Sequence, residues 1–426
     1  MPRTSTAYRA LARLADGLIP LIAGASSKLA RGDRARRAAL DQWRRWAADH
    51  RDRSRPLLWV HAPSVGEGLQ ANAVLDRLRL RNPSWQIVYT FFSPSAESLA
   101  ARQPVDESGY LPYDTRSNVD QLLDALAPTA LVFTKLDLWP ELATTAAARG
   151  VKLGMIAATV SPLTRRDQPV ARWLTRPGYR SLHLVGAIAE PDAVRLAGLG
   201  VLPSAITITG DPRFDSAVER ARSIREDDPL RRLTAGAPTF VAGSTWPADE
   251  LAVLAAFRLL RGQAPDARLI VVPHELDHVG QLTTRVREAG WSHARLSELG
   301  DQIPAIVVVD RVGALATIYG GARGAYVGGG FGTAGLHSVL EPAALGVPVV
   351  VGPRWQSSRE AGLLIHGGGA RPLPTTDPAA ALARTWAEWV DPVAATSAGH
   401  RALAVVTAEL GAADRSAALV EKLLSG

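Results

Sequence analysis

The chain has 426 residues, no cysteine and a net charge of +7. Residues 1–55 hold 13 Lys or Arg and 5 Asp, so the excess of basic charge belongs to the N-terminal segment and the rest of the chain is close to neutral. This uneven charge disfavours a nucleic-acid-binding protein, which more often has a basic face across its folded domain, and the lack of cysteine excludes disulfides and thiolate metal sites.

The N-terminal segment combines an apolar helical stripe with basic residues. The stripe has helical spacing and consists of Tyr8, Leu11, Leu14, Leu18, Leu21 and Ile22. Its charge-free stretch, residues 17–27, has 11 residues, whereas a spanning helix needs about 20. With Trp43 and Trp46 among the arginines that follow, the segment fits a helix lying on anionic lipid. A helix packed on its own domain, with a solvated basic flank, fits the same pattern.

From residue 57 onward, short β-rich runs alternate with amphipathic stretches. The first series of predicted strands covers 57–62, 86–92, 130–134, 152–158 and 184–189. The helices predicted between them cover 67–81, 95–102, 116–126, 138–148 and 191–199. A second series of strands covers 239–242, 268–272, 305–309, 325–327 and 348–351. Such βαβ series predict parallel sheets that are covered by helices on both faces.

The predicted fold class is therefore α/β, with two doubly wound Rossmann-like domains facing a central cleft and an N-terminal amphipathic helix. The expected divisions are a basic membrane-associating segment 1–55, a first domain 56–215, a polar linker 216–237, a second domain 238–395 and a C-terminal helix 396–426.

Two groups of polar residues follow strands of the first series. Glu67 lies where the first strand ends and a helix begins, a position that suits either a catalytic carboxylate at the sheet's carboxyl edge or a helix-capping one. Lys135 and Asp137 follow the 130–134 strand. Capping of the next helix, with Pro140 in its first turn, would explain Asp137 but not Lys135.

Arg213 lies just before the predicted linker. There it could hold a carboxylate or a phosphate, or form a salt bridge with Asp211 or Asp215. In the second series, Ser244 follows the first strand, where a hydroxyl suits phosphate oxygens.

A Gly-rich run at 328–335 precedes a helix that we expect to begin near Gly335. It lacks the Gly-Lys-Ser/Thr of a P-loop. Phosphate at the helix N-terminus, with Glu341 accepting from ribose hydroxyls, fits two-domain nucleotide-sugar transferases, and a purely structural Glu341 is the alternative. The sequence indicates no metal site and no serine nucleophile of the hydrolase type.

Seven strings in this order resemble the 3-deoxy-D-manno-octulosonic acid (Kdo) transferases, which are GT-B glycosyltransferases. They are Ser-Val-Gly-Glu at 64–67, Tyr-Leu-Pro-Tyr-Asp at 110–114, Leu-Trp-Pro at 138–140, Thr-Gly with Arg-Phe-Asp at 209–215, Gly-Ser-Thr at 243–245, Val-Pro at 272–273 and Leu-Glu-Pro-Ala at 340–343. The resemblance implies an inverting, metal-independent transferase without cofactor that moves Kdo from CMP-Kdo to a lipid A precursor in lipopolysaccharide biosynthesis. It also implies peripheral or N-terminal attachment to the anionic cytoplasmic side of the inner membrane.

The resemblance also implies roles for individual residues. Glu67 falls on the family's catalytic base, and Arg213 falls where the family has a Lys thought to assist the transition state. The implied donor-binding residues are Pro273, His274, Val312, Gly313, Ala314, Ser338, Val339, Leu340 and Glu341.

The chain departs from the family pattern at several of these positions. Lys135 stands where the family typically has Glu, His274 where it has Arg, Ala314 where it has Glu, and Ser338 where it has Asn. These changes keep two alternatives open: a GT-B protein that uses another nucleotide sugar or acts as an epimerase, and a catalytically altered, membrane-bound relative.

Overall fold

A computed structural model describes residues 2–22, 28–161, 164, 166 and 168–425, and the chain forms two compact units. Unit 1 comprises 1–216 and 410–426, and unit 2 comprises 217–409. Residues 23–27 of the predicted charge-free stretch lie outside the described residues.

Unit 1 is built on a seven-stranded parallel sheet with the strand order β3-β2-β1-β4-β5-β6-β7. Its strands are β1 Leu57–His61, β2 Gln86–Phe91, β3 Glu107–Tyr110, β4 Ala130–Thr134, β5 Lys152–Ala158, β6 Leu184–Ala187 and β7 Ile206–Ile208. Its helices are α1 Thr6–Ile22, α2 Lys28–His50, α3 Val65–Arg81, α4 Glu97–Ala100, α5 Arg116–Leu126, α6 Pro140–Ala148, α7 Pro169–Tyr179, α8 Glu190–Leu199 and α17 Ala412–Ser425, and α9 Pro212–Ser223 crosses the boundary of the units.

Unit 2 contains a second seven-stranded parallel sheet with the order β10-β11-β9-β8-β12-β13-β14. Its strands are β8 Thr239–Thr245, β9 Arg268–Pro273, β10 His293–Arg295, β11 Ile306–Val308, β12 Gly324–Val327, β13 Val349–Val351 and β14 Ala370–Pro372. Its helices are α10 Pro247–Arg261, α11 Val279–Glu288, α12 Leu315–Tyr319, α13 Leu340–Ala344, α14 Arg359–His366, α15 Pro378–Val390 and α16 Pro392–Ala408. The prediction of two parallel α/β domains is thus confirmed.

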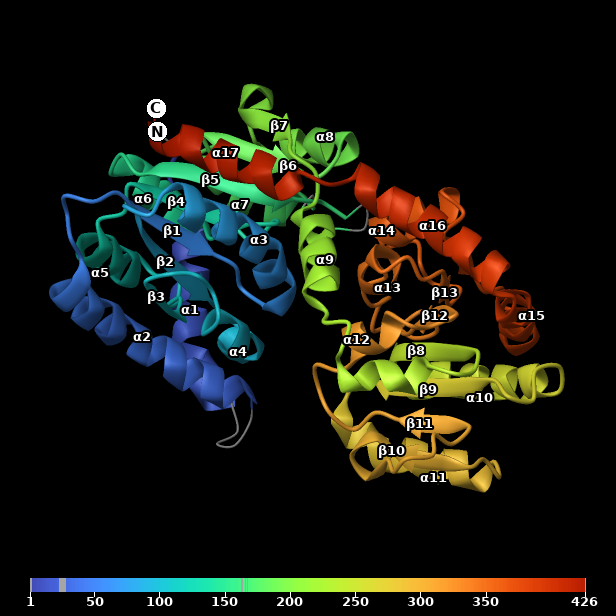
Figure 1. Ribbon diagram of the computed structural model, residues 1–426. Helices are drawn as coiled ribbons and strands as arrows, with labels where there is room; N and C mark the ends of the chain where they lie inside the picture. The colour runs from blue at the N-terminus through green and yellow to red at the C-terminus, as the bar shows by residue number, and fades with distance from the viewer. Residues whose placement is uncertain (1, 23–27, 162–163, 165, 167, 426) are drawn as a thin grey trace. The chain divides into compact units, whose positions relative to one another are not determined.

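The structure differs from the expected division at the C-terminal end of the chain. The predicted helix from 396 onward is two helices, because Gly411 adopts a φ of +85° between α16 and α17. Helix α17 belongs to unit 1, where it lies along β5 and β6 (Figure 1). Val420 and Leu423 are buried in the core of unit 1, so the last segment of the chain completes the first domain.

The predicted linker also differs, because α9 extends through its first part to Ser223. The chain then enters unit 2, where the side chain of Leu233 is buried in an apolar cluster. Within the predicted linker, only the residues between Ser223 and Leu233 have the exposed, charged character expected of a linker.

The placement of Trp43 and Trp46 at a lipid surface is wrong. Both side chains of α2 are buried, and the indole of Trp43 donates a hydrogen bond to the carbonyl of Tyr110 at 2.9 Å. Helix α2 packs against α5 and β3, so it belongs to the first domain and does not form a separate segment with α1. All of its arginines except the buried Arg36 lie on its exposed face, whereas its tryptophans complete the core.

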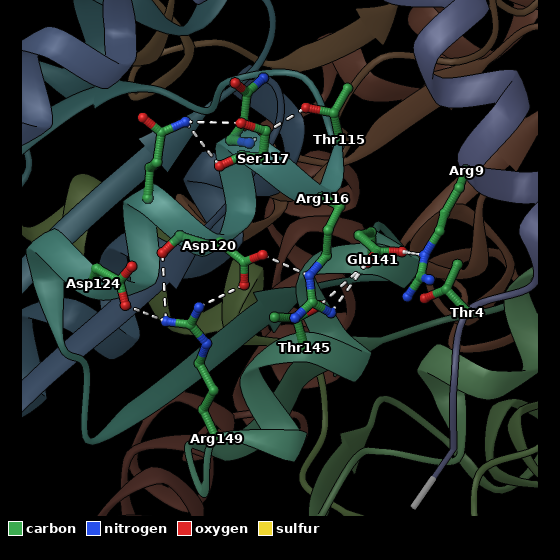
Figure 2. Close-up of polar contacts among 12 residues, drawn as sticks. Thr4, Arg9, Thr115, Arg116, Ser117, Asp120, Asp124, Glu141, Thr145 and Arg149 are labelled. Atoms are coloured by element: carbon green, nitrogen blue, oxygen red, sulfur yellow. Dashed lines mark hydrogen bonds and ion pairs between the residues drawn. The ribbon is translucent and has the colours of Figure 1, made fainter.

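Helix α1 is fixed to unit 1 by polar contacts at its N-terminal end. The hydroxyl of Tyr8 donates to Asp114 at 2.7 Å, and the guanidinium of Arg9 binds the buried carboxylate of Glu141 at 2.8 Å. Figure 2 shows Arg9 and Arg116 converging on Glu141 from two helices. Beyond these contacts, Leu11, Leu14 and Leu18 are each more than half exposed. Among the described residues, no helix has the length and apolar character to cross a bilayer.

The burial of Trp43 generates a stability prediction. We expect Trp43→Ala to lower the free energy of unfolding by about 3–5 kcal/mol, because it removes a large buried ring and leaves a cavity. Chemical denaturation followed by circular dichroism measures the loss. As a control, Leu14→Ser on the exposed face of α1 should change the stability by less than about 0.5 kcal/mol. Equal stability of Trp43→Ala and the unsubstituted protein would contradict this assignment.

Candidate active site

The first candidate site lies where the strand order of unit 1 reverses. Strand β1 pairs with both β2 and β4. The connection that leaves β4 therefore diverges at this point from the connections that leave β1 and β2. In the register, His61 lies opposite Phe133, so the loops that follow both strands start at the same sheet edge. Ligands of open parallel sheets bind at such a reversal.

Glu67 and Lys135 meet at this edge. Glu67 lies in the first turn of α3, and Lys135 follows β4 directly. The ammonium Nζ of Lys135 is 3.0 Å from Oε1 of Glu67, and the hydroxyl of Ser64 donates to Oε2. The two carboxylate oxygens are therefore held by different partners, which fixes the plane of the carboxylate.

These partners determine the ionisation of Glu67. Burial raises the pKa of its carboxyl, but the hydrogen bond from Ser64 and the charge of Lys135 together outweigh burial, so the pKa lies below its usual value. Glu67 is consequently a carboxylate at neutral pH. It is oriented by two donors and able to accept a proton.

The backbone of Lys135 is unusual for a residue with a side chain. Its φ is +66°, and its amide donates to the carbonyl of Ile156 at 2.9 Å. Ser244, near the end of β8 in unit 2, has a φ of +53°. Left-handed conformations of this kind are costly and gather at functional sites. Lys135 and Ser244, both predicted from the sequence as site residues, thus each have a strained backbone at the end of a central strand.

A buried histidine supports the loop that follows β4. The indole of Trp139 donates to Nε2 of His61 at 2.9 Å, so the proton of the neutral ring is on Nδ1, which contacts the hydroxyl of Thr90 at 2.9 Å. Burial lowers the pKa of His61 to about 4. Sequence reasoning missed this residue, although its place at the end of the first strand was a signal.

Asp137 does not cap the helix that follows it. Its carboxylate binds the guanidinium of Arg166 at 2.8 Å. The amides of Glu141 and Leu142 at the start of α6 donate instead to Asp114, each at 2.9 Å. Burial raises the pKa of Asp114 to about 6. The capping interpretation of Asp137 was therefore wrong, and the helix is capped from a distant segment.

Arg213 forms the ion pair that was considered for it from the sequence. Its guanidinium binds the buried carboxylate of Asp211, with Nη2 and Oδ2 2.6 Å apart. Asp215 has another role, because it accepts from the amides of Gly411 and Ala413 at the start of α17. Arg213 is therefore a cation oriented by one neighbouring carboxylate.

A second candidate site lies within unit 2, again where the strand order reverses. Strand β8 pairs with β9 on one side and β12 on the other. Ser244 near the end of β8, His274 after β9 and the Gly-rich run after β12 therefore lie on neighbouring strands. Asp249 joins these segments, because it accepts from the amides of Trp246 and Gly329 and from the hydroxyl of Tyr326. Its place three residues after the N-cap residue Trp246 is the sequence signal that was missed.

The helix after the Gly-rich run begins later than expected. Helix α13 starts at Leu340, not near Gly335, whose φ is +89°. A side chain at Gly329 would come within 2.1 Å of the carbonyl of Gly335, so the run folds back on itself before the helix starts. Proline in the first turn, here Pro342, favours the observed start.

Glu341 lies in the first turn of α13 and is partly exposed. Its carboxylate binds the guanidinium of Arg220 of α9 at 2.5 Å. The two residues before it, Val339 and Leu340, are buried, whereas Ser338 is exposed. Of this predicted stretch, Ser338 and Glu341 are therefore the residues whose side chains can meet a ligand.

The other predicted donor-binding residues form two short segments. Val312 is exposed and Gly313 turns the chain with a φ of +85°, but Ala314 is buried. Pro273 is buried at the end of β9, and His274 after it is exposed. The described residues contain no group of three or more ligating side chains that could hold a metal ion.

Comparison with known proteins agrees with this geometry. Residues 38–216 match the family model described as 3-deoxy-D-manno-octulosonic-acid transferase (kdotransferase). The chain is 28% identical to the 3-deoxy-D-manno-octulosonic acid transferase of Bordetella pertussis over 81% of both chains. It is 25% identical to the transferase of the same name from Haemophilus influenzae, over 69% of this chain and 70% of the relative.

Among solved structures, the UDP-GlcNAc 2-epimerase from Neisseria meningitidis bound to UDP-GlcNAc has a similar fold. Its TM-score is 0.62 at 12% identity, covering 87% of this chain and all of the epimerase. The two parallel α/β units thus define a protein of the GT-B fold class. The match over residues 38–216 and the relatives show that this chain is similar to the Kdo transferases, and they indicate that it is a glycosyltransferase.

The ion pair at Glu67 generates a prediction on ionisation. We expect Lys135→Ala to raise the pKa of the Glu67 carboxyl, because it removes a cation that favours the carboxylate, whereas Lys135→Arg should keep the pKa low. The measurement is a pH titration of ¹³C-labelled glutamate by NMR, with Glu67→Gln assigning the signal. An unchanged titration in Lys135→Ala would show that Ser64 alone sets the ionisation.

Proposed function

We propose that the protein transfers Kdo from CMP-Kdo to a lipid A precursor, with inversion at the anomeric carbon and without a metal ion. The observation that carries the proposal is the ionised carboxylate of Glu67, held by Ser64 and Lys135 at the reversal of the first sheet. The names and the shared sequence of the relatives support Kdo as the sugar transferred.

In the proposed reaction, the carboxylate of Glu67 takes the proton from the acceptor hydroxyl. The acceptor oxygen forms a bond with the anomeric carbon of Kdo while the bond from that carbon to the phosphate oxygen breaks. CMP leaves with the electron pair of that bond, and a single displacement inverts the anomeric centre. Lys135 orients the base and lowers its pKa, so we assign it a positioning role within the catalytic group.

The proposed donor-binding groups are the loops of unit 2. Ser244 and Ser338 offer hydroxyls, His274 offers an imidazole, and Glu341 can accept from ribose hydroxyls once Arg220 exchanges its contact. The charge that develops on the leaving phosphate is stabilised by such donors and by cations, so a bound metal is not needed. Arg213, oriented by Asp211, is the cation proposed to act on the leaving phosphate.

A second candidate function follows from two positions of the proposed site at which the ionisable side chain differs from that of the family pattern. Lys135 replaces a carboxylate and His274 replaces a guanidinium relative to the family pattern, and both changes affect groups proposed to bind the substrates. They favour a transferase for another nucleotide sugar as the alternative. Thermal shifts with CMP, UDP and GDP separate the two, because stabilisation by UDP without CMP would support the alternative.

The decisive assay for the proposed function follows Kdo transfer from CMP-Kdo to a tetraacylated lipid A precursor. We expect Glu67→Gln to reduce kcat by about 10²–10⁴-fold, because it removes the general base and keeps the size of the side chain. Thermal unfolding of the variant checks that the fold is intact. Transfer at the unsubstituted rate would refute Glu67 as the base, and lack of transfer by the unsubstituted protein would refute the proposed substrates.

We also propose that the protein associates with the anionic cytoplasmic face of the inner membrane through α1. Leu11, Leu14 and Leu18 form an exposed apolar stripe, and Tyr8 and Arg9 hold the helix to unit 1 so that this stripe has a fixed direction. An amphipathic helix with this pattern lies in the interface of a bilayer and does not span it.

We therefore expect the triple variant Leu11→Ser, Leu14→Ser and Leu18→Ser to lower affinity for phosphatidylglycerol vesicles by about tenfold or more, because each leucine loses apolar burial in the lipid. Sedimentation with vesicles measures the binding. The matched control is Leu80→Ser in α3, which is also highly exposed in unit 1 and should bind like the unsubstituted protein. Unchanged sedimentation of the triple variant would remove α1 as the membrane contact.

A further inference from the structure

One guanidinium holds the segment that follows β4. Nη1 of Arg166 donates to the carbonyl of Leu136 at 2.7 Å, and Nη2 binds the carboxylate of Asp137 at 2.8 Å. The hydroxyl of Tyr179 in α7 donates to the same carbonyl at 3.0 Å and accepts from Nη1 of Arg166 at 3.1 Å. These contacts fix the two residues that come directly after Lys135.

Packing against α7 holds the same segment from one side. Leu138 is buried in the core of unit 1, and a side chain at Gly178 would come within 2.3 Å of its Cδ2 atom. The side chain of Tyr179 is fully buried as well. Because interiors are close-packed, the hydrogen bonds from Arg166 and Tyr179 act on a loop whose distance from α7 is fixed.

Lys135 needs such support for two reasons. Its φ of +66° is costly for a residue with a side chain, and conformations of this kind persist only where the surrounding structure determines them. Its side chain is also 43% exposed, whereas that of Glu67 is 14% exposed. An exposed lysine gains little from an ion pair, because holding its long side chain costs entropy. The pair with Glu67 therefore depends on where the backbone places Lys135.

Two titratable groups on the strands beside Glu67 are uncharged at neutral pH. Burial lowers the pKa of His61 in β1 to about 4, and burial followed by the charge of Glu67 raises the pKa of Tyr89 in β2. Arg213, at the start of α9, is bound by Asp211.

The charged groups on the helices that pack against α3 have partners of their own. Helices α4 and α17 both contact α3. Glu97 of α4 binds Arg31, and Asp414 of α17 binds Arg81. A change in the loop after β4 leaves all of these pairs in place.

We propose that Arg166 is a positioning residue for the catalytic pair. By holding Leu136 and Asp137, it keeps the backbone of Lys135 in its left-handed conformation and so keeps the ammonium against Glu67. Arg166 acts through Lys135 and not by contact with the substrate. The inference rests on the proposed function in taking Glu67 as the base, but its effect can be measured without a substrate.

The test follows the ionisation of Glu67 by NMR of ¹³C-labelled glutamate in the full chain, with Arg166→Gln, Lys135→Ala and the double variant. We expect Arg166→Gln to raise the pH at which Glu67 titrates by about half or more of the shift seen in Lys135→Ala, because a mobile lysine stabilises the carboxylate less. The double variant should show the shift of Lys135→Ala alone, since no ammonium is left to position.

The double variant also separates positioning from a direct effect of charge. Arg166 is itself a cation, and a direct effect of its charge on Glu67 would add to the shift of Lys135→Ala. An additive shift would therefore overturn the inference. An unchanged titration in Arg166→Gln, or in Lys135→Ala, would overturn it as well.

The matched control is Arg149→Gln. The side chains of Arg149 and Arg166 are 33% and 34% exposed, and both arginines bind carboxylates in unit 1. Figure 2 shows that Arg149 binds Asp120 and Asp124, which do not belong to the segment after β4. Arg149→Gln should therefore leave the titration of Glu67 unchanged. A shift equal to that of Arg166→Gln would show a general loss of charge or stability and would overturn the inference.

A second variant tests the same role if thermal unfolding shows that Arg166→Gln does not fold. Tyr179→Phe removes only the hydroxyl that donates to Leu136 and keeps the buried ring. It should raise the pH at which Glu67 titrates by a smaller amount and have no effect in the Lys135→Ala background. An unchanged titration in a folded Tyr179→Phe would then overturn the inference.

Activity separates this inference from the proposed function. With CMP-Kdo and a lipid A precursor, the acid limb of the kcat profile of Arg166→Gln should move by as many pH units as the NMR titration. If the unsubstituted protein transfers no Kdo but the titrations shift as expected, the proposed function fails and the positioning role stands. If Kdo is transferred and the titration of Arg166→Gln is unchanged, the positioning role alone fails.

Discussion

The pairing of β1 with β4 is the constraint on which the candidate site of unit 1 depends. All strands of the sheet are parallel, so every strand ends at the same edge, and the strand order reverses between these two. The connections from β1 and β4 then leave on opposite sides, and residues 68 positions apart, Glu67 and Lys135, come within 3.0 Å. Without this pairing, the carboxylate would lose the cation that lowers its pKa.

Unit 2 also gathers its candidate residues at a reversal of strand order, but their side chains have a different chemistry. Its reversal lies at β8, and the loops gathered there carry hydroxyls, rings and glycines in place of an ion pair. Asp249 makes this arrangement rigid, because one buried carboxylate holds the start of α10 and the amide of Gly329 at the same time. Such a buried group is stabilising only when all its hydrogen-bond partners are present. The loops of the second site therefore depend on one another.

The sequence predicted the central strands well and missed the edges. Central strands are buried on both faces and read as continuous apolar runs, which is why 130–134 and 152–158 agree with the structure. The missed strands β3, β7, β10 and β14 are the four sheet edges, and each has only three or four residues and no continuous apolar run. Their pairing is determined by the neighbouring strand, so their own residues carry little signal.

The sequence predicted which residues lie at the candidate sites, but it did not predict the contacts between their side chains. The ends of strands identified Glu67, Lys135, Ser244 and His274, whereas the hydrogen bond from Trp246 to His337 joins residues 91 positions apart and depends on how the loops fold.

The charge at position 135 shows how the contact with Glu67 affects the pKa of that carboxyl. A carboxylate there, as in the resembling family, would repel Glu67 and raise its pKa, making it a stronger base that is ionised over a narrower range of pH. Lys135 has the opposite effect, so this chain holds a weaker base that stays ionised at lower pH.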